Sequence, residues 1–302
     1  MKPKNALLLF LAAFIWGIAF VAQSNAAAYI RPFTFNGIRC LIGGITLLPP
    51  VLMTQLKNRK SLPFGESFEL YRHSSAKRLR YGLVGGFCCG ICLCAGSTLQ
   101  QFGIEQTTVG KAGFITALYI VFVPIASALF LRKKITLPVI VSVLLGLAGL
   151  FLLCINGQLS IGKGDFYVLL CSFAFTAHIL VIDYFSAKAD GVLLSCVQFL
   201  TCFVISLPVI LLAEKPEPGQ IFAAAVPILY AGILSCGVAY TLQIIGQKDM
   251  NPTIASLILS MESVISVLAG WILLHQTLSA REIVGCIVMF AAIIIAQLPT
   301  RQ

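Results

Sequence analysis

Long unbroken runs of apolar residues follow one another along almost the whole chain. A run of about 20 mostly apolar residues is what an α-helix needs to cross the hydrocarbon core of a bilayer. A spanning segment must satisfy its backbone hydrogen bonds without water, so it is a helix or part of a closed β-barrel. Barrel strands alternate polar and apolar residues, and these runs do not alternate. The runs therefore predict an all-α membrane protein.

Ten such runs predict ten transmembrane helices. The composition agrees, because 59% of the 302 residues are apolar and 11% are charged, whereas soluble domains average roughly 45–50% and 25%. The predicted helices are 5–24, 33–54, 80–102, 110–131, 135–155, 165–186, 191–213, 222–245, 253–274 and 281–298.

The formal charge of +10 is distributed as expected for a membrane protein, so we expect no nucleic-acid partner. With both termini in the cytoplasm, fifteen of the 21 Lys and Arg residues lie on the cytoplasmic side, five lie outside, and Arg39 lies within a span. An excess of Lys and Arg in cytoplasmic segments is the orientation rule for such proteins. The longest predicted loop, 56–79, is basic and is expected to be solvated or to contact anionic lipid.

All eleven cysteines lie within predicted spans, which argues against a disulfide framework. The run Cys88-Cys89-Gly90-Ile91-Cys92-Leu93-Cys94 raises the alternative of a soft metal ion, since thiolates bind copper(I) and zinc. No His, Met or acidic ligand accompanies it on its helix, and Cys also serves as a small apolar residue. We therefore expect neither a metal site nor a cofactor.

The sequence contains an internal repeat. Thr98-Leu99-Gln100-x-x-Gly103 recurs as Thr241-Leu242-Gln243-x-x-Gly246, and this offset of 143 places Tyr119 over Glu262. Upstream an offset of about 159 aligns Ala13-Phe14-Ile15-Trp16 with Ser172-Phe173-Ala174-Phe175. The predicted units are 1–156, which includes the loop 56–79, and 157–302.

Each unit holds five predicted spans. Because five is odd, the second unit is expected to enter the membrane upside down relative to the first. Inverted repeats are typical of secondary transporters, whose substrate site lies near the midplane where the two units meet. Two near-equivalent packings of the units can exchange, which allows outward-open and inward-open states.

The residues from Pro252 to Val264, followed by Gly270-Trp271-Ile272-Leu273-Leu274, closely resemble the ninth helix of EamA-type transporters of the drug/metabolite transporter superfamily. Ala13-Phe14-Ile15-Trp16-Gly17, Phe35-x-x-x-Arg39 and Gly164-Asp165 are similar to that family too. The chain departs from it at Glu262-Ser263, where Glu-Pro is frequent, and at His275-Gln276, where Gly-Glu is frequent. The resemblance implies a ten-helix bundle with a central cavity and the transport of metabolites, often amino acids or their derivatives.

Three ionisable residues are predicted at membrane depth, where such groups normally face the bundle interior or a cavity. Glu262 is expected to bind a cationic group or a proton, or else to bond two helices together. Arg39 is expected to meet a substrate carboxylate, or to pair with Glu262 or with helix-end carbonyls. His178 is expected to relay protons, or to be a hydrogen-bonded packing residue.

Aromatic and amide side chains complete the predicted site. Trp16, Tyr119 and Tyr240 form either an aromatic wall for an organic substrate or ordinary packing. Gln100 and Gln243 correspond to each other in the repeat and are candidates for gates or helix contacts. With the three ionisable residues, these five make up the predicted central cavity.

We expect no enzymatic activity. Gly162-Lys163-Gly164-Asp165 matches the Gly-x-Gly-Asp pattern of aspartyl intramembrane proteases, but Asp165 falls at a predicted helix start and no Tyr-Asp partner exists. Two converging carboxylates are needed for that chemistry. No Gly-x-x-x-x-Gly-Lys-[Ser/Thr] motif is present to cradle nucleotide phosphates.

The sequence thus predicts a secondary transporter that moves a small metabolite across the cytoplasmic membrane by alternating access, as an exporter. Its expected partners are the small-molecule substrate, the lipid bilayer and protons as a coupling ion. The alternatives are a multidrug or organic-cation exporter and a membrane receptor that binds without transport.

Overall fold

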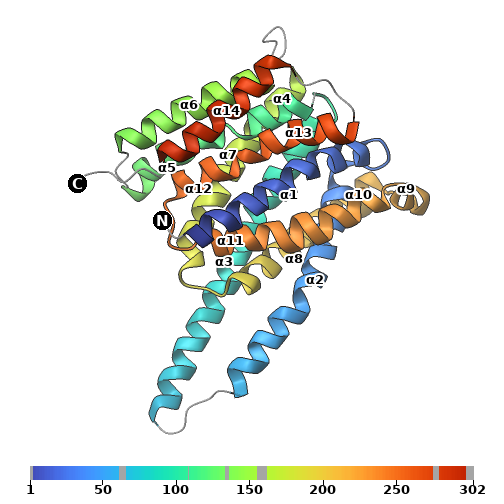
Figure 1. The fold of residues 1–302 in the computed structure, drawn as a ribbon. Coiled ribbons are helices and arrows are strands. Elements are labelled where there is room, and N and C mark those ends of the chain that lie inside the picture. Colours follow the sequence, from blue (N-terminus) through green and yellow to red (C-terminus); the bar gives the residue numbers. More distant parts are fainter. Residues whose placement is uncertain are drawn as a thin grey trace.

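The protein is described from a computed structural model, which covers residues 3–60, 66–107, 109–132, 136–154, 162–274 and 279–296. Helices joined by short turns make up these residues, and no strand occurs among them (Figure 1). The protein is an all-α membrane protein.

The first half of the chain forms six helices within its described residues. The bounds are α1 (Pro3–Ala27), α2 (Pro32–Lys60), α3 (Glu66–Ile104), α4 (Val109–Thr116), α5 (Tyr119–Leu131) and α6 (Leu137–Cys154).

The second half contains two π-helical segments, η1 and η2, besides α-helices. The bounds are α7 (Lys163–Ser186), α8 (Gly191–Val209), η1 (Ile210–Glu214), α9 (Pro218–Ala223), α10 (Ala225–Leu229), η2 (Tyr230–Tyr240), α11 (Thr241–Gln247), α12 (Pro252–Leu259), α13 (Met261–Leu274) and α14 (Ala280–Ala296). Pro252 is the first residue of α12, a position that proline favours, and the Asn251 side chain caps this helix by accepting a hydrogen bond from the Thr253 amide at 2.9 Å.

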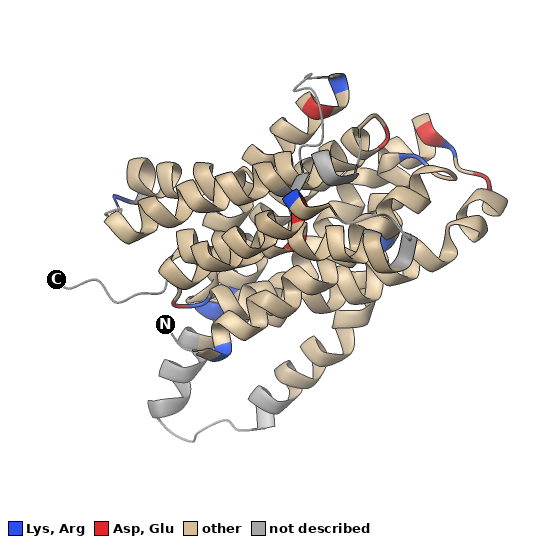
Figure 2. Ribbon diagram, turned by 45° about the horizontal axis from the view of Figure 1, so that its top comes forward, with Lys and Arg blue, Asp and Glu red and all other residues tan. Residues whose placement is uncertain are grey.

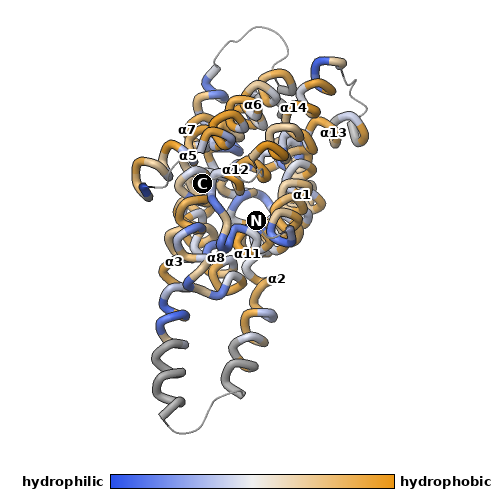
Figure 3. The backbone as a smooth tube through the Cα atoms, turned by 60° about the vertical axis from the view of Figure 1, so that its left-hand side comes forward, coloured by the Kyte–Doolittle hydropathy of each residue, from blue (hydrophilic) through white to orange (hydrophobic). Residues whose placement is uncertain are grey.

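The outer surface of the bundle is suited to lipid. Eight helical stretches in the described chain are long and apolar enough to cross a membrane, and Leu137–Leu152 is a shorter apolar helix. Large apolar side chains such as Leu129, Phe130 and Leu212 are more than two-thirds exposed. Charged residues gather toward the ends of the bundle, whose body is mostly hydrophobic (Figures 2 and 3).

The interior contains many polar side chains, among them Asn36, Arg39, Gln198 and Glu262. An apolar exterior around a partly polar interior is what a bilayer requires, because an ionisable group is costly in lipid. The largest core cluster lies among α1, α5, α7, α12 and α13. A second cluster joins α2, α3, α8 and η2.

Each long helix packs against particular partners. Helix α6 packs along α14, α3 packs along α7 and α8, and α2 packs along α8 and η2 (Figure 1). Helix α1 contacts α13, η2 and α11. Each of these contacts joins a helix from the first half of the sequence to a helix from the second half.

A stripe of small residues runs along α3 and consists of Gly82, Gly86, Gly90, Cys94 and Thr98. The three glycines of this stripe face α8. A Cβ atom on Gly90 would lie 2.5 Å from Cβ of Thr201 and 2.7 Å from the carbonyl oxygen of Gln198. A Cβ atom on Gly86 would lie 2.5 Å from Cβ of Val197. The stripe is thus a close helix contact, as small-xxx-small spacing predicts.

The structure corrects the prediction of a loop at 56–79. Residues 56–60 continue α2 and residues 66–79 belong to α3, so both helices project beyond the bundle (Figure 1). This stretch is rich in Lys, Arg, Glu and Leu, which favour helix even outside a membrane. The remainder, 61–65, lies outside the described residues.

The predicted span 222–245 is divided at Ala224, close to its start, and two other predicted spans are divided well inside their length. The predicted helix 110–131 is interrupted at Ala117 and Leu118, and 253–274 is interrupted at Ser260. Backbone bonds to the third preceding residue, such as Ile120 N to Ala117 O at 3.0 Å and Ser263 N to Ser260 O at 3.1 Å, tighten the chain at both places. At the second place the Ser260 hydroxyl also donates to the carbonyl of Leu257 at 2.8 Å.

Candidate functional site

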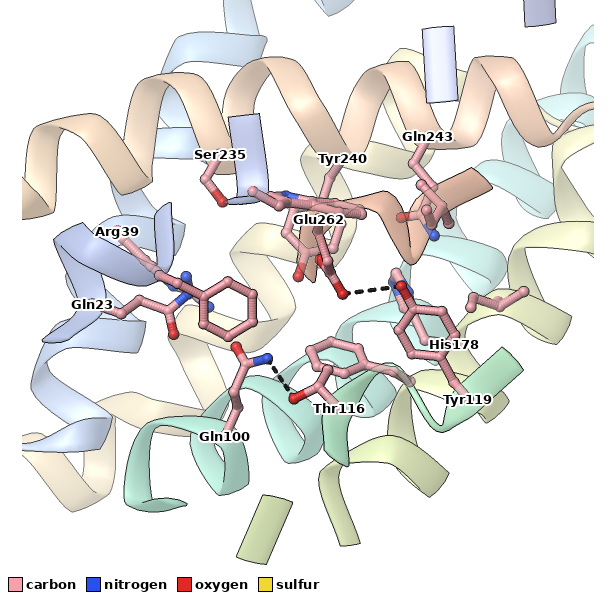
Figure 4. A pocket seen from close by; sticks show the side chains of 15 residues that line it. Gln23, Arg39, Gln100, Thr116, Tyr119, His178, Ser235, Tyr240, Gln243 and Glu262 are labelled. Carbon is pink, nitrogen blue, oxygen red and sulfur yellow. Dashed lines mark hydrogen bonds between the residues drawn. The ribbon is translucent and has the colours of Figure 1, made fainter. Parts of the chain in front are cut away.

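The two interrupted helices bring a polar cavity to the centre of the bundle. Thr116 and Tyr119 flank the break between α4 and α5, and Leu259 and Glu262 flank the break between α12 and α13. All four residues line a cavity with about 500 Å³ of space between its atoms, its open end included (Figure 4). Helices α1, α2, α3, α7, η2 and α11 supply the other walls.

The structure brings all eight residues of the predicted site to this one cavity. They are Trp16, Arg39, Gln100, Tyr119, His178, Tyr240, Gln243 and Glu262. Trp16 is half-buried, and the other seven are buried. That they bind a substrate stays a prediction.

Glu262 is bonded to the residue that the repeat pairs with it. The Tyr119 hydroxyl donates to Oε1 of Glu262 at 2.9 Å, and 143 residues separate the two (Figure 4). Each residue lies within the first turn of the half-helix that follows a break. Their bond therefore joins the two halves of the sequence at the centre of the cavity.

Arg39 is held by a hydrogen-bond network that does not include Glu262. Its Nε donates to Oδ1 of Asn36 at 2.9 Å, and Nδ2 of Asn36 donates to Oγ of Ser97 at 2.7 Å and to Oγ1 of Thr98 at 2.9 Å. The guanidinium also lies 5.2 Å from the centre of the Phe35 ring. In the described part of the chain no hydrogen bond joins Arg39 to Glu262, so the predicted pairing of these two residues is not observed.

His178 is oriented by one amide and two aromatic rings. Its Nε2 lies 3.0 Å from Oε1 of Gln198, and because an amide oxygen only accepts, the imidazole donates in the tautomer that carries its proton on Nε2. The imidazole meets the Tyr240 ring edge-on at 5.8 Å between centroids and the Phe175 ring at 6.5 Å. A hydrogen-bonded histidine on a cavity wall is compatible with both of its predicted roles.

Two of the three predicted aromatic side chains are in contact, because the ring centroids of Trp16 and Tyr240 lie 4.6 Å apart. Polar atoms of the wall are only partly paired: Gln100 donates to Thr116 at 3.2 Å and Gln243 donates to Gln247 at 3.2 Å. The indole nitrogen of Trp16 and Oε1 of Gln243 are buried and have no hydrogen-bond partner among the described residues. Unused donor and acceptor atoms therefore lie on the cavity wall.

Seven cavity residues were not predicted, namely Phe20, Gln23, Thr116, Phe175, Ile179, Ser235 and Leu259. Some carried a signal in the sequence. Phe175 aligns with Trp16 in the repeat, and Thr116 and Leu259 each precede a predicted residue by three positions, which places them on the same helix face. Ser235 carried none, because its place depends on how η2 packs.

A separate polar group lies at the ends of α2, α3 and η1. Glu214 accepts hydrogen bonds from the amides of Phe33 at 3.0 Å and Thr34 at 2.6 Å, and so caps the start of α2. Glu105 lies one residue beyond α3. Burial raises the pKa of the Glu105 carboxyl, Glu214 raises this pKa further, and Arg31 opposes the shift.

The thiols do not form a metal centre in the part of the chain that is described. No group of three or more His, Cys, Asp or Glu residues there is arranged to hold a metal ion. Ten cysteines are free thiols, and Cys154 lies where side chains are not described. The side chain of Asp165 accepts hydrogen bonds from the Gly162 amide at 2.7 Å and the Thr107 hydroxyl at 2.6 Å, as befits a helix start.

The chain matches a known protein family over almost its whole length. The model of the EamA-like transporter family matches residues 3–155 and 162–297. The chain belongs to this family.

Relatives of this EamA-like protein carry names that agree with the family. An uncharacterized transporter of Archaeoglobus fulgidus is 28% identical over 291 residues, which cover 96% of this chain and 84% of that one. The uncharacterized transporter YoaV of Bacillus subtilis is 22% identical over 284 residues, which cover 92% of this chain and 91% of YoaV. Both names indicate a membrane transporter, and neither states a substrate.

A solved structure has the same fold as this EamA-like chain. A crystal structure of another protein superposes with a TM-score of 0.76 at 16% sequence identity, covering 98% of this chain and 97% of the other. At that identity the likeness concerns the fold alone. The family match and the apolar helices together make the chain a multi-pass membrane protein of a transporter family.

Proposed function

We propose that the protein is a secondary carrier that exports a small metabolite, an amino acid or a related compound, across the cytoplasmic membrane by alternating access. The observation that carries the proposal is the buried cavity at the meeting of the two sequence repeats. The Tyr119–Glu262 bond in it joins two positions that the repeat makes equivalent. A site shared by two related halves can be exposed to either side when their packing is exchanged.

The proposed architecture has ten spans in two inverted units, 1–156 and 157–302. Two equivalent hydrogen bonds support it: Asn36 to Thr98 and Ser195 to Thr241 are both 2.9 Å long, and offsets of 159 and 143 relate their members. The breaks after Thr116 and Leu259 are also related by 143 residues. The family model matches two segments, 3–155 and 162–297, and the proposed boundary between residues 156 and 157 lies in the gap between them.

The last spans of the two proposed units are the shortest. The eight long apolar stretches correspond to the other eight proposed spans, so α6 and α14 would be the fifth and the tenth. These helices have 18 and 17 residues and are about 26 Å long at 1.5 Å per residue. A slightly thinned bilayer accommodates that length at modest cost. Helices α6 and α14 pack against each other, as equivalent helices beside a two-fold axis would.

We further propose that protons drive transport through Glu262, with both termini in the cytoplasm. The support is the position of this carboxylate on the cavity wall and its bond to the other half of the protein. A group that binds either a proton or the substrate couples the two in a carrier. The distribution of Lys and Arg supports the orientation.

An organic-cation exporter is the second candidate. A carboxylate beside the rings of Trp16, Tyr119 and Tyr240 would suit a lipophilic cation. Arg39 lines the same cavity and opposes a purely cationic substrate, which makes the metabolite carrier the better conclusion. A receptor would bind a ligand without passing it.

The deciding experiment is uptake and counterflow of a metabolite library in proteoliposomes, with and without an imposed proton gradient. We expect saturable flux of one compound class, competed within that class and changed by the gradient. Flux confined to lipophilic cations would favour the second candidate. Binding without flux by folded protein would overturn the carrier and favour a receptor.

A further inference from the structure

Arg39 is a buried cation without an acidic partner among the described residues. Its side chain is 2% exposed and lies near the thiols of Cys40, Cys202 and Cys236 and the phenol of Tyr240, and no ion pair joins it to a carboxylate of the described residues. Nε bonds Asn36, while the terminal nitrogens Nη1 and Nη2 form no hydrogen bond within the described chain. An isolated charge is costly in a low-dielectric interior unless it is paired. The cavity that Arg39 lines is where a counter-ion can enter.

Asn36 fixes the direction of this guanidinium. Both functional atoms of its amide are used, because Oδ1 accepts from Arg39 and Nδ2 donates to Ser97 and Thr98 on α3. The Ser97 hydroxyl in turn donates to the Leu93 carbonyl at 2.5 Å. With Nε held in this way, the two terminal nitrogens remain free to bind a second group.

We propose that Arg39, positioned by Asn36, is an anion subsite that takes the carboxylate of the transported solute; this deepens, and rests on, the proposed carrier function. A guanidinium presents its N–H groups in a planar fork that matches two carboxylate oxygens. The indole N–H of Trp16, which has no partner within the described chain, is a further donor on the same cavity wall.

The arrangement gives the solute an orientation. Arg39 and Gln23 lie at one end of the cavity, Tyr119, His178 and Gln243 lie at the other, and Glu262 lies between them (Figure 4). The repeat offset of 159 pairs Arg39 with Gln198, so the equivalent position of the second unit is neutral. The carboxylate therefore binds at one end only, and the rest of the solute extends toward Glu262.

Binding is tested directly through Trp16. The chain has two tryptophans, and Trp271→Phe, on an exposed position of α13, leaves Trp16 as the sole tryptophan fluorophore. The probes are phenylacetate, phenylacetamide and phenethylamine, which share a shape and differ in charge. We expect phenylacetate to bind about 10- to 100-fold more tightly than phenylacetamide, the range of a charged hydrogen-bonded contact. Equal affinities, or no binding of phenylacetate by folded protein, would overturn the subsite.

Two variants separate an anion subsite from a structural arginine. Arg39→Gln should abolish the preference for phenylacetate. Asn36→Asp is nearly isosteric and supplies a built-in carboxylate for Arg39, although it loses the amide donor to Ser97 and Thr98, so in folded protein it should weaken phenylacetate binding about 10-fold or more. A purely structural role of Arg39 predicts unchanged phenylacetate binding by folded Asn36→Asp. The matched control is Arg281→Gln, because Arg281 also lies 5.2 Å from an aromatic ring, that of Phe151, but at a half-buried position outside the cavity.

Flux measurements distinguish failure of this inference from failure of the carrier function. Saturable transport of solutes without an anionic group, unaffected by Arg39→Gln, would overturn the subsite and leave the carrier intact. Anion-selective binding without flux of any solute would retain the subsite and overturn the carrier.

Discussion

At the scale of single residues, the chemistry of the cavity depends on a few buried polar groups, each hydrogen-bonded to particular partners. Tyr119 is hydrogen-bonded to Glu262, and Arg39 is hydrogen-bonded to Asn36. Removal of one member leaves the other with an unpaired buried group, which costs about 1–3 kcal/mol or more for a charge. Such pairs can be tested one atom at a time.

Replacement of Glu262 by glutamine should separate coupling from folding. Glu262→Gln keeps an oxygen that can accept from the Tyr119 hydroxyl, but its amide cannot exchange a proton. We expect flux to fall by about 10-fold or more, or to lose its response to pH, with unchanged helix content and monodispersity. The measurement is proteoliposome flux between about pH 5 and about pH 8. Glu217→Gln, on the exposed loop before α9, is the control, and a parental pH profile in Glu262→Gln would contradict proton coupling.

The Tyr119–Glu262 bond itself is measured by a double-mutant cycle. Tyr119→Phe and Glu262→Met, which removes the acceptor at similar size, should show, alone and together, a coupling free energy of about 1.5–3 kcal/mol because the acceptor is a carboxylate. The readout is the free energy of unfolding in mixed detergent micelles. Additive effects of the two substitutions would show that the bond contributes nothing.

At the scale of helices, the close contact between α3 and α8 depends on glycines, because a Cβ atom at these positions would clash with α8. Gly90→Leu would drive a side chain into Thr201 and the backbone of Gln198, and Gln198 holds His178. We expect a loss of about 1–3 kcal/mol in unfolding free energy, as for other overpacked sites. Thermal unfolding in detergent measures it. The control is Gly219→Leu, where a Cβ would meet nothing within 4 Å, and equal effects at both sites would refute the close contact.

The helix ends near Glu105 predict a pH dependence of stability. Because burial and Glu214 raise the pKa of Glu105, its protonated form is favoured in the folded protein, and this stabilisation is present below the ordinary value of 4.5 and is lost as the pH rises. Glu105→Gln should therefore increase stability near neutral pH, by less than about 1 kcal/mol because the carboxyl is only partly buried. Melting temperatures at a series of pH values test this. A variant less stable than the parent at neutral pH would contradict the sign.

At the scale of the whole molecule, the proposed inverted repeat makes a topological prediction. The segment around Gly219 should face outside and the turn at Lys248 should face the cytoplasm, because one proposed span separates them. Gly219→Cys should react with a membrane-impermeant maleimide in intact cells, and Lys248→Cys should react only after permeabilisation. The parent protein controls for its native thiols. Labelling of both positions from the same side would refute the proposed topology.

The sequence alone was sufficient for the class of fold and for the identity of eight cavity residues. Apolar runs of spanning length require helices, because lipid cannot satisfy a free backbone group. Polar residues within those runs must turn inward, so Arg39, His178 and Glu262 could be selected from their types and depth. The recurrence of Thr-Leu-Gln-x-x-Gly indicated which residues correspond.

Only the tertiary structure decided how these residues are paired. Sequence spacing does not state which helices are neighbours, so Glu262 was only one of several possible partners for Arg39. In the folded chain Arg39 is hydrogen-bonded to Asn36, and Glu262 is hydrogen-bonded to Tyr119. The breaks at Ala117 and Ser260 were missed, because the residues there are compatible with a continuous helix and the interruption arises from local backbone and hydroxyl bonds. The helical extensions of α2 and α3 were missed because the polar residues at 56–79 were interpreted as a loop. Polar residues show where a segment leaves the membrane, but a helix can continue beyond that point. Hydrophobicity determines which segments enter the bilayer, and packing determines which side chains meet within it.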